Sequence, residues 1–135
     1  MCGQIKLFNR SIRPGDIVRF SIKNKELNGK WGLSDGKIYN ARSEKLNGLW
    51  SPMNRGYLPI SSFYENNREF KLNDNGMIIP ILINPLGEFA IITRESEGIV
   101  KEYHHRMPVI IENTHEWLDN KLLIQPDYSK LNQII

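Results

Sequence analysis

Short alternations of apolar and polar residues recur along the chain and predict a protein built mainly from strands. In residues 16–22, Val18, Phe20 and Ile22 fall on one face, and polar residues between them fall on the other. Successive strand side chains point to opposite faces, so this period of two predicts a half-buried strand over Asp16–Ile22. Further strands are expected at Gly56–Ile60, Glu69–Leu72, Met77–Ile83, Glu88–Thr93 and Met107–Ile111.

Residues that favour turns and helix ends separate these runs. The sequence Asn-Asp-Asn-Gly at 73–76 is expected to join the strands on either side of it as a hairpin turn, because Asn and Gly tolerate positive φ. Good helix formers over Ala41–Leu49, with Asn40 in the capping position, predict a helix. A second, short helix is expected to begin at the capping-box sequence 113–116.

These elements predict a single α+β domain over residues 1–135, a twisted and mostly antiparallel sheet that is partly barrel-like, with a few short helices. The hydrophobic fraction of 40% and the charged fraction of 24% are ordinary for a globular chain and argue against disorder. No apolar run is long enough to span a bilayer, and the first residues do not resemble a secretion signal. We therefore expect no membrane partner, and we also expect a monomer.

Cysteine and histidine usage restricts the chemistry further. Cys2 is the only cysteine, which excludes an internal disulfide and fits the reducing cytoplasm. The spacing of His104, His105 and His115 matches no common ligand pattern, so we expect neither a metal site nor a cofactor.

Charge is distributed unevenly along the chain. The net charge is +3, but residues 1–71 carry +7 and residues 72–135 carry −4. The basic half is therefore the better candidate for contact with phosphates, although a run of charge can also be no more than a solvated face.

The amino terminus carries the most specific chemistry. Initiator methionine is generally removed before a small residue, so Met-Cys-Gly predicts a mature chain that begins at Cys2, with an α-amine and a thiol on adjacent carbons. An α-amine is roughly 15% neutral at pH 7, whereas a lysine amine is neutral only about 0.04% of the time. Such a terminus suits attack on an aldehyde. Alternatively, Cys2 is simply a small residue near a fraying chain end.

Four downstream segments extend this N-terminal signal. With Met1-Cys2-Gly3 in front, their order resembles the SRAP family (SOS-response-associated peptidase, or abasic-site processing proteins), whose signatures read MCGR, WGL, NARxE, P-x-x-x-FYEW and HxRMPV. The matching segments are Trp31-Gly32-Leu33, Asn40-Ala41-Arg42-Ser43-Glu44, Leu58 to Glu65, and Ile92-Thr93 followed by His104 to Ile110. Gln4 and Asn66 depart from the pattern, and the chain is shorter than a typical member.

The resemblance implies a protein that captures abasic sites in single-stranded DNA through a thiazolidine crosslink to its N-terminal cysteine, at the nucleoid when DNA is damaged, with an autopeptidase activity that exposes the cysteine. In the carried-over roles, Cys2 is the nucleophile and Asn40 hydrogen-bonds the sugar or the cysteine end. Glu65 is the general acid/base, and His104 assists Schiff-base formation and reversal. For DNA binding, the resemblance assigns phosphate contacts to Arg42 and Arg106. It assigns a backbone contact to Thr93 and base stacking to Trp31.

These residue types suit the chemistry. Opening a ring-closed abasic sugar requires proton transfer at the ring oxygen, which suits a carboxyl with a raised pKa. Loss of water from the carbinolamine needs a group that titrates near neutrality, such as a histidine. Thiol attack on the imine closes a five-membered ring with a very high effective molarity. An arginine fork can hold two phosphate oxygens.

Each residue also has a purely structural interpretation. Glu65 could end a strand facing solvent, Asn40 could only cap its helix, and Trp31 could belong to the core, as Trp50 and Trp117 are expected to. Arg42 and Arg106 could pair with nearby glutamates, namely Glu44 or Glu102. His104 and His105 would point to opposite faces of a strand, so at most one serves the site.

Two other functions are consistent with the sequence. Met-Cys-Gly also begins N-terminal-nucleophile amidohydrolases, which use the thiol on an amide, and glutaminase activity would identify one. The third possibility is a noncatalytic single-stranded DNA-binding protein with the same fold.

Overall fold

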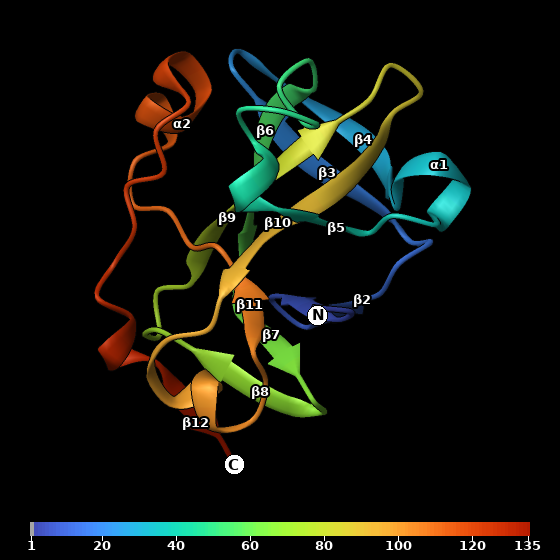
Figure 1. Cartoon of the computed structure of the whole chain (residues 1–135). Helices are drawn as coiled ribbons and strands as arrows, with labels where there is room; N and C mark the ends of the chain where they lie inside the picture. Colours follow the sequence, from blue (N-terminus) through green and yellow to red (C-terminus); the bar gives the residue numbers. More distant parts are fainter. Residues whose placement is uncertain (1) are drawn as a thin grey trace.

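A computed structural model describes residues 2–135 and shows two β-sheets (Figure 1). The strands of the smaller sheet, in order across it, are β12 (Asn132–Ile134), β8 (Arg68–Lys71), β7 (Ser62–Glu65), β1 (Ile5–Leu7) and β2 (Arg10–Ile12). Those of the larger sheet are β11 (Arg106–Pro108), β10 (Glu88–Glu95), β4 (Lys25–Trp31), β3 (Ile17–Ile22), β6 (Asn54–Ile60) and β9 (Met77–Ile83), with β5 (Asn40–Arg42) paired to β10.

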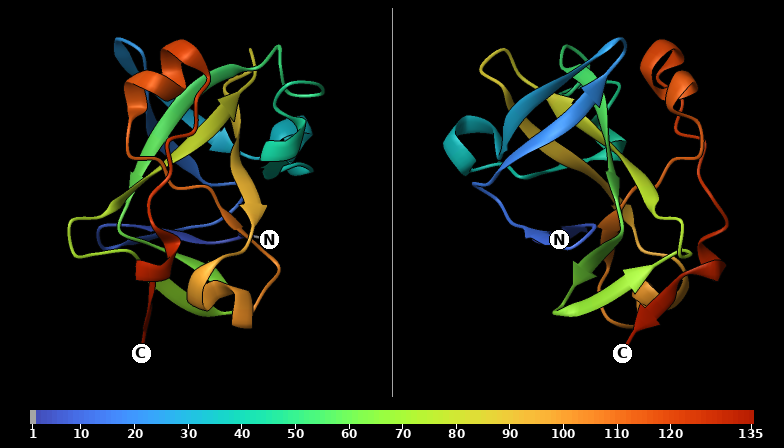
Figure 2. Two further views of the ribbon diagram at one scale, coloured as in Figure 1. Left: turned by 60° about the vertical axis from the view of Figure 1, so that its left-hand side comes forward. Right: turned by 180° about the vertical axis from the view of Figure 1, so that it is seen from behind.

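The larger sheet closes on itself. Because β9 also pairs with β10, the strands β10, β4, β3, β6 and β9 form a ring, which the two views of Figure 2 show from different sides. All pairings are antiparallel except those of β10 with β4 and with β5. Closure pairs both edges of these strands, which removes the exposed backbone groups of an open sheet. The expected strand-dominated, mostly antiparallel and partly barrel-like domain is thus confirmed.

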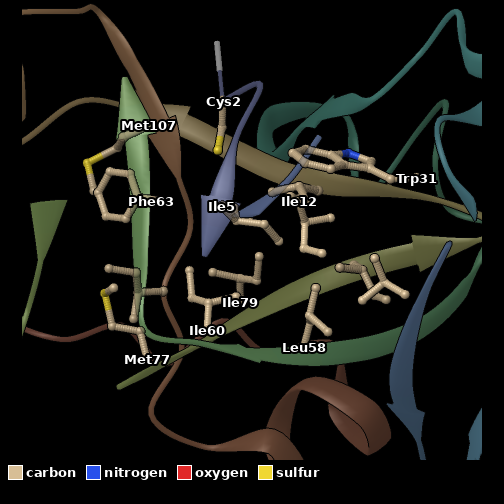
Figure 3. Packing of buried hydrophobic residues seen from close by; sticks show 14 of the residues in the cluster. Cys2, Ile5, Ile12, Trp31, Leu58, Ile60, Phe63, Met77, Ile79 and Met107 are labelled. Atoms are coloured by element: carbon tan, nitrogen blue, oxygen red, sulfur yellow. The ribbon is translucent and has the colours of Figure 1, made fainter. Parts of the chain in front are cut away.

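Strand β10 is buried on both faces and separates two hydrophobic clusters. Phe89 and Ile91 belong to the larger cluster, whereas Ala90 and Ile92 belong to a second cluster that includes Trp117. A strand covered on both faces is a nearly continuous apolar run, as residues 89–92 are. The larger cluster includes Cys2 among its members (Figure 3).

The helix expected to begin at residues 113–116 is confirmed. It is α2 (Thr114–Asn120), and the Asn113 side chain accepts a hydrogen bond from the backbone of Glu116 at 3.0 Å. The helix packs on β6, where the indole nitrogen of Trp117 donates to the carbonyl of Gly56 at 2.8 Å. Trp117 is buried, as expected, and Trp50 is half-buried. Within residues 2–135, no helix is long and apolar enough to cross a membrane.

The helix expected over 41–49 is wrong. Residues 40–42 form β5, and only the short 3-10 helix η1 (Ser43–Lys45) follows, so Asn40 is a strand residue and not a cap. Pairing of β5 with β10 supplies backbone partners that a short isolated helix would lack, and it outweighs local helix propensity. Another short element, α1 (Leu33–Gly36), has positive φ at Ser34 and Asp35 and is a tight turn rather than a regular helix.

The expected hairpin around 73–76 is also wrong. Its two flanking strands exist as β8 and β9, but β8 pairs with β7 and β12, whereas β9 pairs with β6 and β10. The turn therefore passes the chain from one sheet to the other. The last expected strand is shorter than predicted, since only Arg106–Pro108 forms β11 and Ile111 makes an isolated bridge to Ile78.

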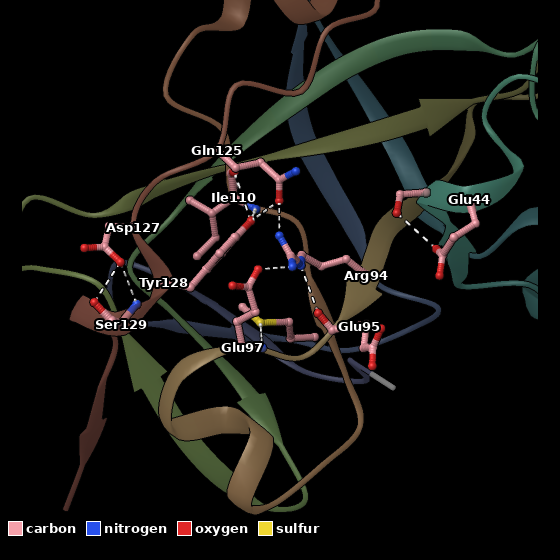
Figure 4. A network of polar contacts seen from close by, with 11 residues as sticks. Glu44, Arg94, Glu95, Glu97, Ile110, Gln125, Asp127, Tyr128 and Ser129 are labelled. Atoms are coloured by element: carbon pink, nitrogen blue, oxygen red, sulfur yellow. Dashed lines mark hydrogen bonds and ion pairs between the residues drawn. The ribbon is translucent and has the colours of Figure 1, made fainter.

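A polar network attaches the carboxy-terminal segment to β10 (Figure 4). The buried hydroxyl of Tyr128, in the 3-10 helix η3 (Tyr128–Lys130), donates to Gln125 at 2.5 Å and accepts from the backbone nitrogen of Ile110 at 3.0 Å. Arg94 donates to the same Gln125 oxygen at 2.8 Å, pairs with Glu97, and lies over the Tyr128 ring. This network holds the last residues against the ring of strands.

Candidate active site

Cys2 and Asn40 are joined by a reciprocal pair of hydrogen bonds. The backbone nitrogen of Cys2 donates to Oδ1 of Asn40 at 3.0 Å, and Nδ2 of Asn40 donates back to the Cys2 carbonyl at 2.8 Å. Asn40 is on β5 and so belongs to the larger sheet, whereas Cys2 leads into β1 of the smaller sheet. The two hydrogen bonds therefore fix the amino-terminal segment at the junction of the two sheets.

Glu65 lies at the end of β7, beside the same segment. Strand β1 pairs with β7, and the nitrogen of Tyr64 donates to the carbonyl of Gln4 at 3.0 Å, which brings residues 2–4 alongside the end of β7. The Glu65 side chain is buried, and this burial raises the pKa of its carboxyl from 4.5 to about 7. Burial also raises the pKa of the Cys2 thiol, and the negative charge of Glu65 raises it further. Cys2 is thus a protonated thiol close to a carboxyl that titrates near neutrality.

His104 completes the group from a third direction. It lies between the 3-10 helix η2 (Gly98–Glu102) and β11, and its Nδ1 is 3.8 Å from Oε1 of Glu65. The same nitrogen lies 3.0 Å from the backbone nitrogen of Arg106. Burial lowers the pKa of the imidazole below its ordinary value. His104 and His105 precede the strand and their rings stack at 4.6 Å, but it is His104 that reaches Glu65.

A polar cavity of about 450 Å³ opens beside this group. Its wall includes His104 itself, the residue after Cys2 and both neighbours of Glu65. The lining residues are Gly3, Gln4, Arg13, Tyr64, Asn66, Asn67 and His104. A larger cavity of about 560 Å³ lies at the other end of β1, against Phe8 and Met77, and none of the four predicted reacting residues lines it.

Arg106 is held by protein groups. Its guanidinium donates to both carboxylate oxygens of Glu44, at 2.6 and 3.0 Å, and to the hydroxyl of Thr93 at 3.2 Å. Arg106 and Thr93 are both buried, whereas the Glu44 side chain is 54% exposed. Of the pairings considered for the two arginines, the one between Arg106 and Glu44 is therefore present. A DNA phosphate would have to compete with Glu44 for this guanidinium.

Arg42 and Trp31 have opposite environments. Arg42 is exposed and lies two residues after Asn40 on β5, so its side chain leaves the strand on the same face as that of Asn40. Trp31 has no exposed surface, stacks on Phe89 and donates from its indole nitrogen to the Tyr39 carbonyl at 2.8 Å. The expectation that Trp31 stacks on a DNA base is corrected, because no ring face is available.

Sequence reasoning missed the residues that shape the cavity. Tyr64 and Asn66 flank the predicted acid Glu65, so their sequence positions alone could have identified them. Arg13 was not among the predicted site residues. It reaches the site because β1 and β2 pair with Ile5 opposite Ile12, which places Gln4 and Arg13 as the next pair across the two strands. The turn between these strands is Phe8-Asn9, which is not a typical hairpin sequence.

A comparison with protein families finds a match to part of the chain. The sequence model described as SOS response associated peptidase (SRAP) matches residues 71–134, and the resemblance is confirmed over that stretch. The matched residues include Thr93, His104 and Arg106, whereas Cys2 and the other motifs precede them. A search of curated proteins found no match to the chain.

Proposed function

We propose that this protein, whose residues 71–134 match the SRAP family, captures abasic sites in single-stranded DNA as a covalent thiazolidine adduct of Cys2. One observation carries the proposal. Four residues far apart in the sequence, Cys2, Asn40, Glu65 and His104, meet at one junction between the sheets beside a polar cavity. They are the groups that the condensation of an aldehyde with an aminothiol requires.

The first step uses the nitrogen of Cys2. In the Met1-containing chain this nitrogen is an amide, and removal of Met1 would turn it into a primary amine. Met1 itself lies outside the described residues. Because this nitrogen donates to Oδ1 of Asn40, the same hydrogen bond would orient the amine lone pair after Met1 is lost.

Glu65 supplies the proton that opens the sugar. An abasic deoxyribose is mostly a closed hemiacetal, and only its open form presents an aldehyde. A carboxyl with a pKa of about 7 is still substantially protonated at neutral pH, so it can protonate the ring oxygen. Its carboxylate form can then accept a proton from the 1-hydroxyl or the attacking amine. His104, whose Nδ1 lies 3.8 Å from Glu65, is placed to relay protons during loss of water.

The thiol closes the adduct. The amine adds to the aldehyde carbon, the carbinolamine loses one water to give the imine, and the thiol then adds across the imine. In this last step sulfur bonds to carbon and the thiol proton passes to nitrogen. The aldehyde carbon thus exchanges its oxygen, lost as water, for single bonds to nitrogen and sulfur. Amine and thiol belong to one residue, so the ring closes without a further encounter.

The environment of Cys2 favours this chemistry over thiolate catalysis. A cysteine hydrolase requires a thiolate, which usually comes from a lowered pKa. Here burial and the charge of Glu65 raise the pKa of Cys2. A protonated thiol does not compete with the amine for the aldehyde, but it can still trap an imine. This observation disfavours the alternative of an N-terminal-nucleophile amidohydrolase.

The basic half of the chain supports DNA as the partner. Residues 1–71 carry a net charge of +7, and Arg42 is exposed on the Asn40 side of β5. We propose that Arg42 contacts the backbone beside the lesion, and that binding is tolerant of sequence because phosphates carry no base information.

Intact-mass measurement tests the proposal. A chain that begins at Cys2 is incubated with a single-stranded oligonucleotide containing one abasic site, and the expected product has the summed mass of both components less one water. The matched control is an oligonucleotide with a tetrahydrofuran site, which has no aldehyde. With Cys2→Ala, we expect an imine that borohydride traps, and no heat-stable product without reduction.

The chain that retains Met1 is the decisive negative control. Its Cys2 nitrogen is an amide without a nucleophilic lone pair, so both the imine and the stable product should be absent. A heat-stable crosslink formed by this chain would refute the amine mechanism. Absence of any crosslink from the Cys2-initiated chain would leave a noncatalytic DNA-binding protein.

A further inference from the structure

The cavity beside the reacting residues has the composition of an anion site. Among the described residues that line it, Arg13 is the permanent cation, Gln4, Asn66 and Asn67 carry amide donors, and none is a carboxylate. Burial lowers the pKa of His104 below its ordinary value, which disfavours a positive charge on this ring. A cavity of about 450 Å³ is large enough for one nucleotide sugar with its phosphate.

The guanidinium of Arg13 is oriented but not neutralised. Its Nη2 donates to Oε1 of Gln4 at 3.2 Å, and Nε2 of Gln4 donates in turn to the Ser11 hydroxyl at 3.3 Å. Among the ion pairs within residues 2–135, none involves this guanidinium. The nearby carboxylate of Asp16 accepts from the backbone nitrogen of Arg13 instead. Most of the fork therefore remains available for a ligand.

The turn that forms another part of the wall is equally well defined. Asn66 and Asn67 form the turn between β7 and β8, with φ of 52° and 62°, and Glu65 is paired with Arg68 across it. Such a two-residue turn needs positive φ at both positions, which asparagine tolerates. Nδ2 of Asn66 also donates to the carbonyl of Tyr103 at 3.2 Å, so the turn is attached to the segment that carries His104. This part of the wall is thus fixed by the fold.

We infer that this cavity binds a phosphodiester of the DNA backbone next to the abasic sugar, with Arg13 as its anion-binding residue. The inference rests on the proposed function, because the cavity adjoins the residues that would react with the sugar. A sugar that reaches Cys2 from this cavity has a phosphate on each side. A guanidinium fork at its wall can donate to two oxygens of one of them.

The test measures noncovalent binding, so that it does not depend on crosslinking. Binding of a single-stranded oligonucleotide with one tetrahydrofuran site is measured by fluorescence anisotropy over a range of salt concentrations. We expect Arg13→Gln to weaken binding and to reduce the slope of log K against log salt by about 0.7, the value for one phosphate contact on a single strand. Arg13→Lys should restore most of the slope, because it restores the charge.

Arg10→Gln is the matched control. Arg10 is also exposed, its Nη2 donates to the carbonyl of Ile17 at 3.3 Å, and it does not line the cavity. We expect this variant to change the slope much less than Arg13→Gln. Equal changes in the two variants would show that only overall charge matters, and would overturn the inference.

An oligonucleotide with one uncharged phosphate analogue tests which phosphate Arg13 contacts. Replacing one phosphate beside the tetrahydrofuran site with a methylphosphonate should weaken binding by the wild type and have little further effect on Arg13→Gln. Equal losses in both proteins, for substitution on either side of the site, would overturn the inference. If these results appear but the Cys2-initiated chain forms no crosslink with abasic DNA, the phosphate site stands and the covalent reaction fails.

Discussion

Arg106 donates to both carboxylate oxygens of Glu44, a residue 62 positions away in the sequence, at 2.6 and 3.0 Å. The pair links β11, which follows His104, to η1, which follows Asn40. It therefore connects the segments that follow two of the predicted reacting residues, and it also pairs the guanidinium of an arginine predicted to contact DNA with a carboxylate.

Removing the Glu44 charge should strengthen DNA binding. In Glu44→Gln the guanidinium of Arg106 keeps a hydrogen-bond partner but its charge is no longer cancelled. We expect higher affinity for single-stranded DNA and a steeper salt dependence, measured by anisotropy. The matched control is Glu26→Gln, which removes the carboxylate of another pair, with Arg19 at 2.7 Å. If both variants gain the same affinity, Arg106 has no specific contact with phosphate.

Acid should weaken the fold through the same pair. The hydrogen bonds from Arg106 lower the pKa of Glu44 from 4.5 to about 2. Because the depressed pKa belongs to the folded state, the contribution of Glu44 to stability is fully present above pH 4.5 and is lost as the pH falls through about 2. Denaturant titrations across that window should show a shallower loss of unfolding free energy in Glu44→Gln. Parallel curves for the two proteins would contradict this assignment.

Glu65→Gln should separate ring opening from the later steps. The amide cannot protonate the ring oxygen, so crosslinking to a ring-closed abasic site should slow far more than reaction with a simple open-chain aldehyde. In the wild type, the rate with the ring-closed substrate should fall as the pH rises through about 7, where Glu65 loses its proton. That limb of the pH profile should disappear in the variant. Equal slowing with both substrates would remove Glu65 from ring opening.

Asn40→Ala should slow the reaction without changing DNA affinity. The substitution removes both hydrogen bonds to Cys2, each worth about 1 kcal/mol, so we expect crosslinking about 10-fold to 100-fold slower. Asn28→Ala, at an exposed position of β4, is the control. Single-turnover rates and anisotropy check the two halves of this prediction. Unchanged rates would show that Asn40 does not orient the amine.

Trp31→Phe should affect stability and not DNA binding. The indole is fully buried and its hydrogen bond to Tyr39 would be lost, so we expect about 2 kcal/mol of destabilisation by chemical denaturation. Affinity for single-stranded DNA should match that of Trp50→Phe, a half-buried tryptophan elsewhere. A selective loss of affinity in Trp31→Phe would restore the stacking role that the structure argues against.

The hydrophobic pattern predicted those strands whose burial on one or both faces shows in their own residues. β3 alternates because one face is buried, and β9 is a continuous apolar run between turn residues. β5 was missed because its residues favour helix, and its strand conformation depends on pairing with β10, about 50 residues away. The turn at 73–76 was read correctly as a turn, but which strands pair is decided by long-range contacts that no local signal contains.

The same difference between local and long-range information applies to the candidate site. Motifs in the sequence mark Cys2, Asn40, Glu65 and His104 as candidates, and the structure brings them together. Arg13 was missed because its place depends on the register of β1 with β2, and Trp31 was misread because a motif does not say which way a ring points. Residue types indicate which chemistry is available, whereas the exposure of a given side chain can be known only from the fold.

Strand β10 pairs with β4, β5, β9 and β11, so Asn40 and the segment after His104 are both attached to one strand at the centre of the domain. Moving one of these residues relative to the other would require opening that strand, and this costs nearly as much as unfolding the domain. The amide hydrogens of β10 should accordingly exchange with solvent only through global unfolding. In the proposed capture of DNA, Asn40 and the segment after His104 would therefore keep their relative positions.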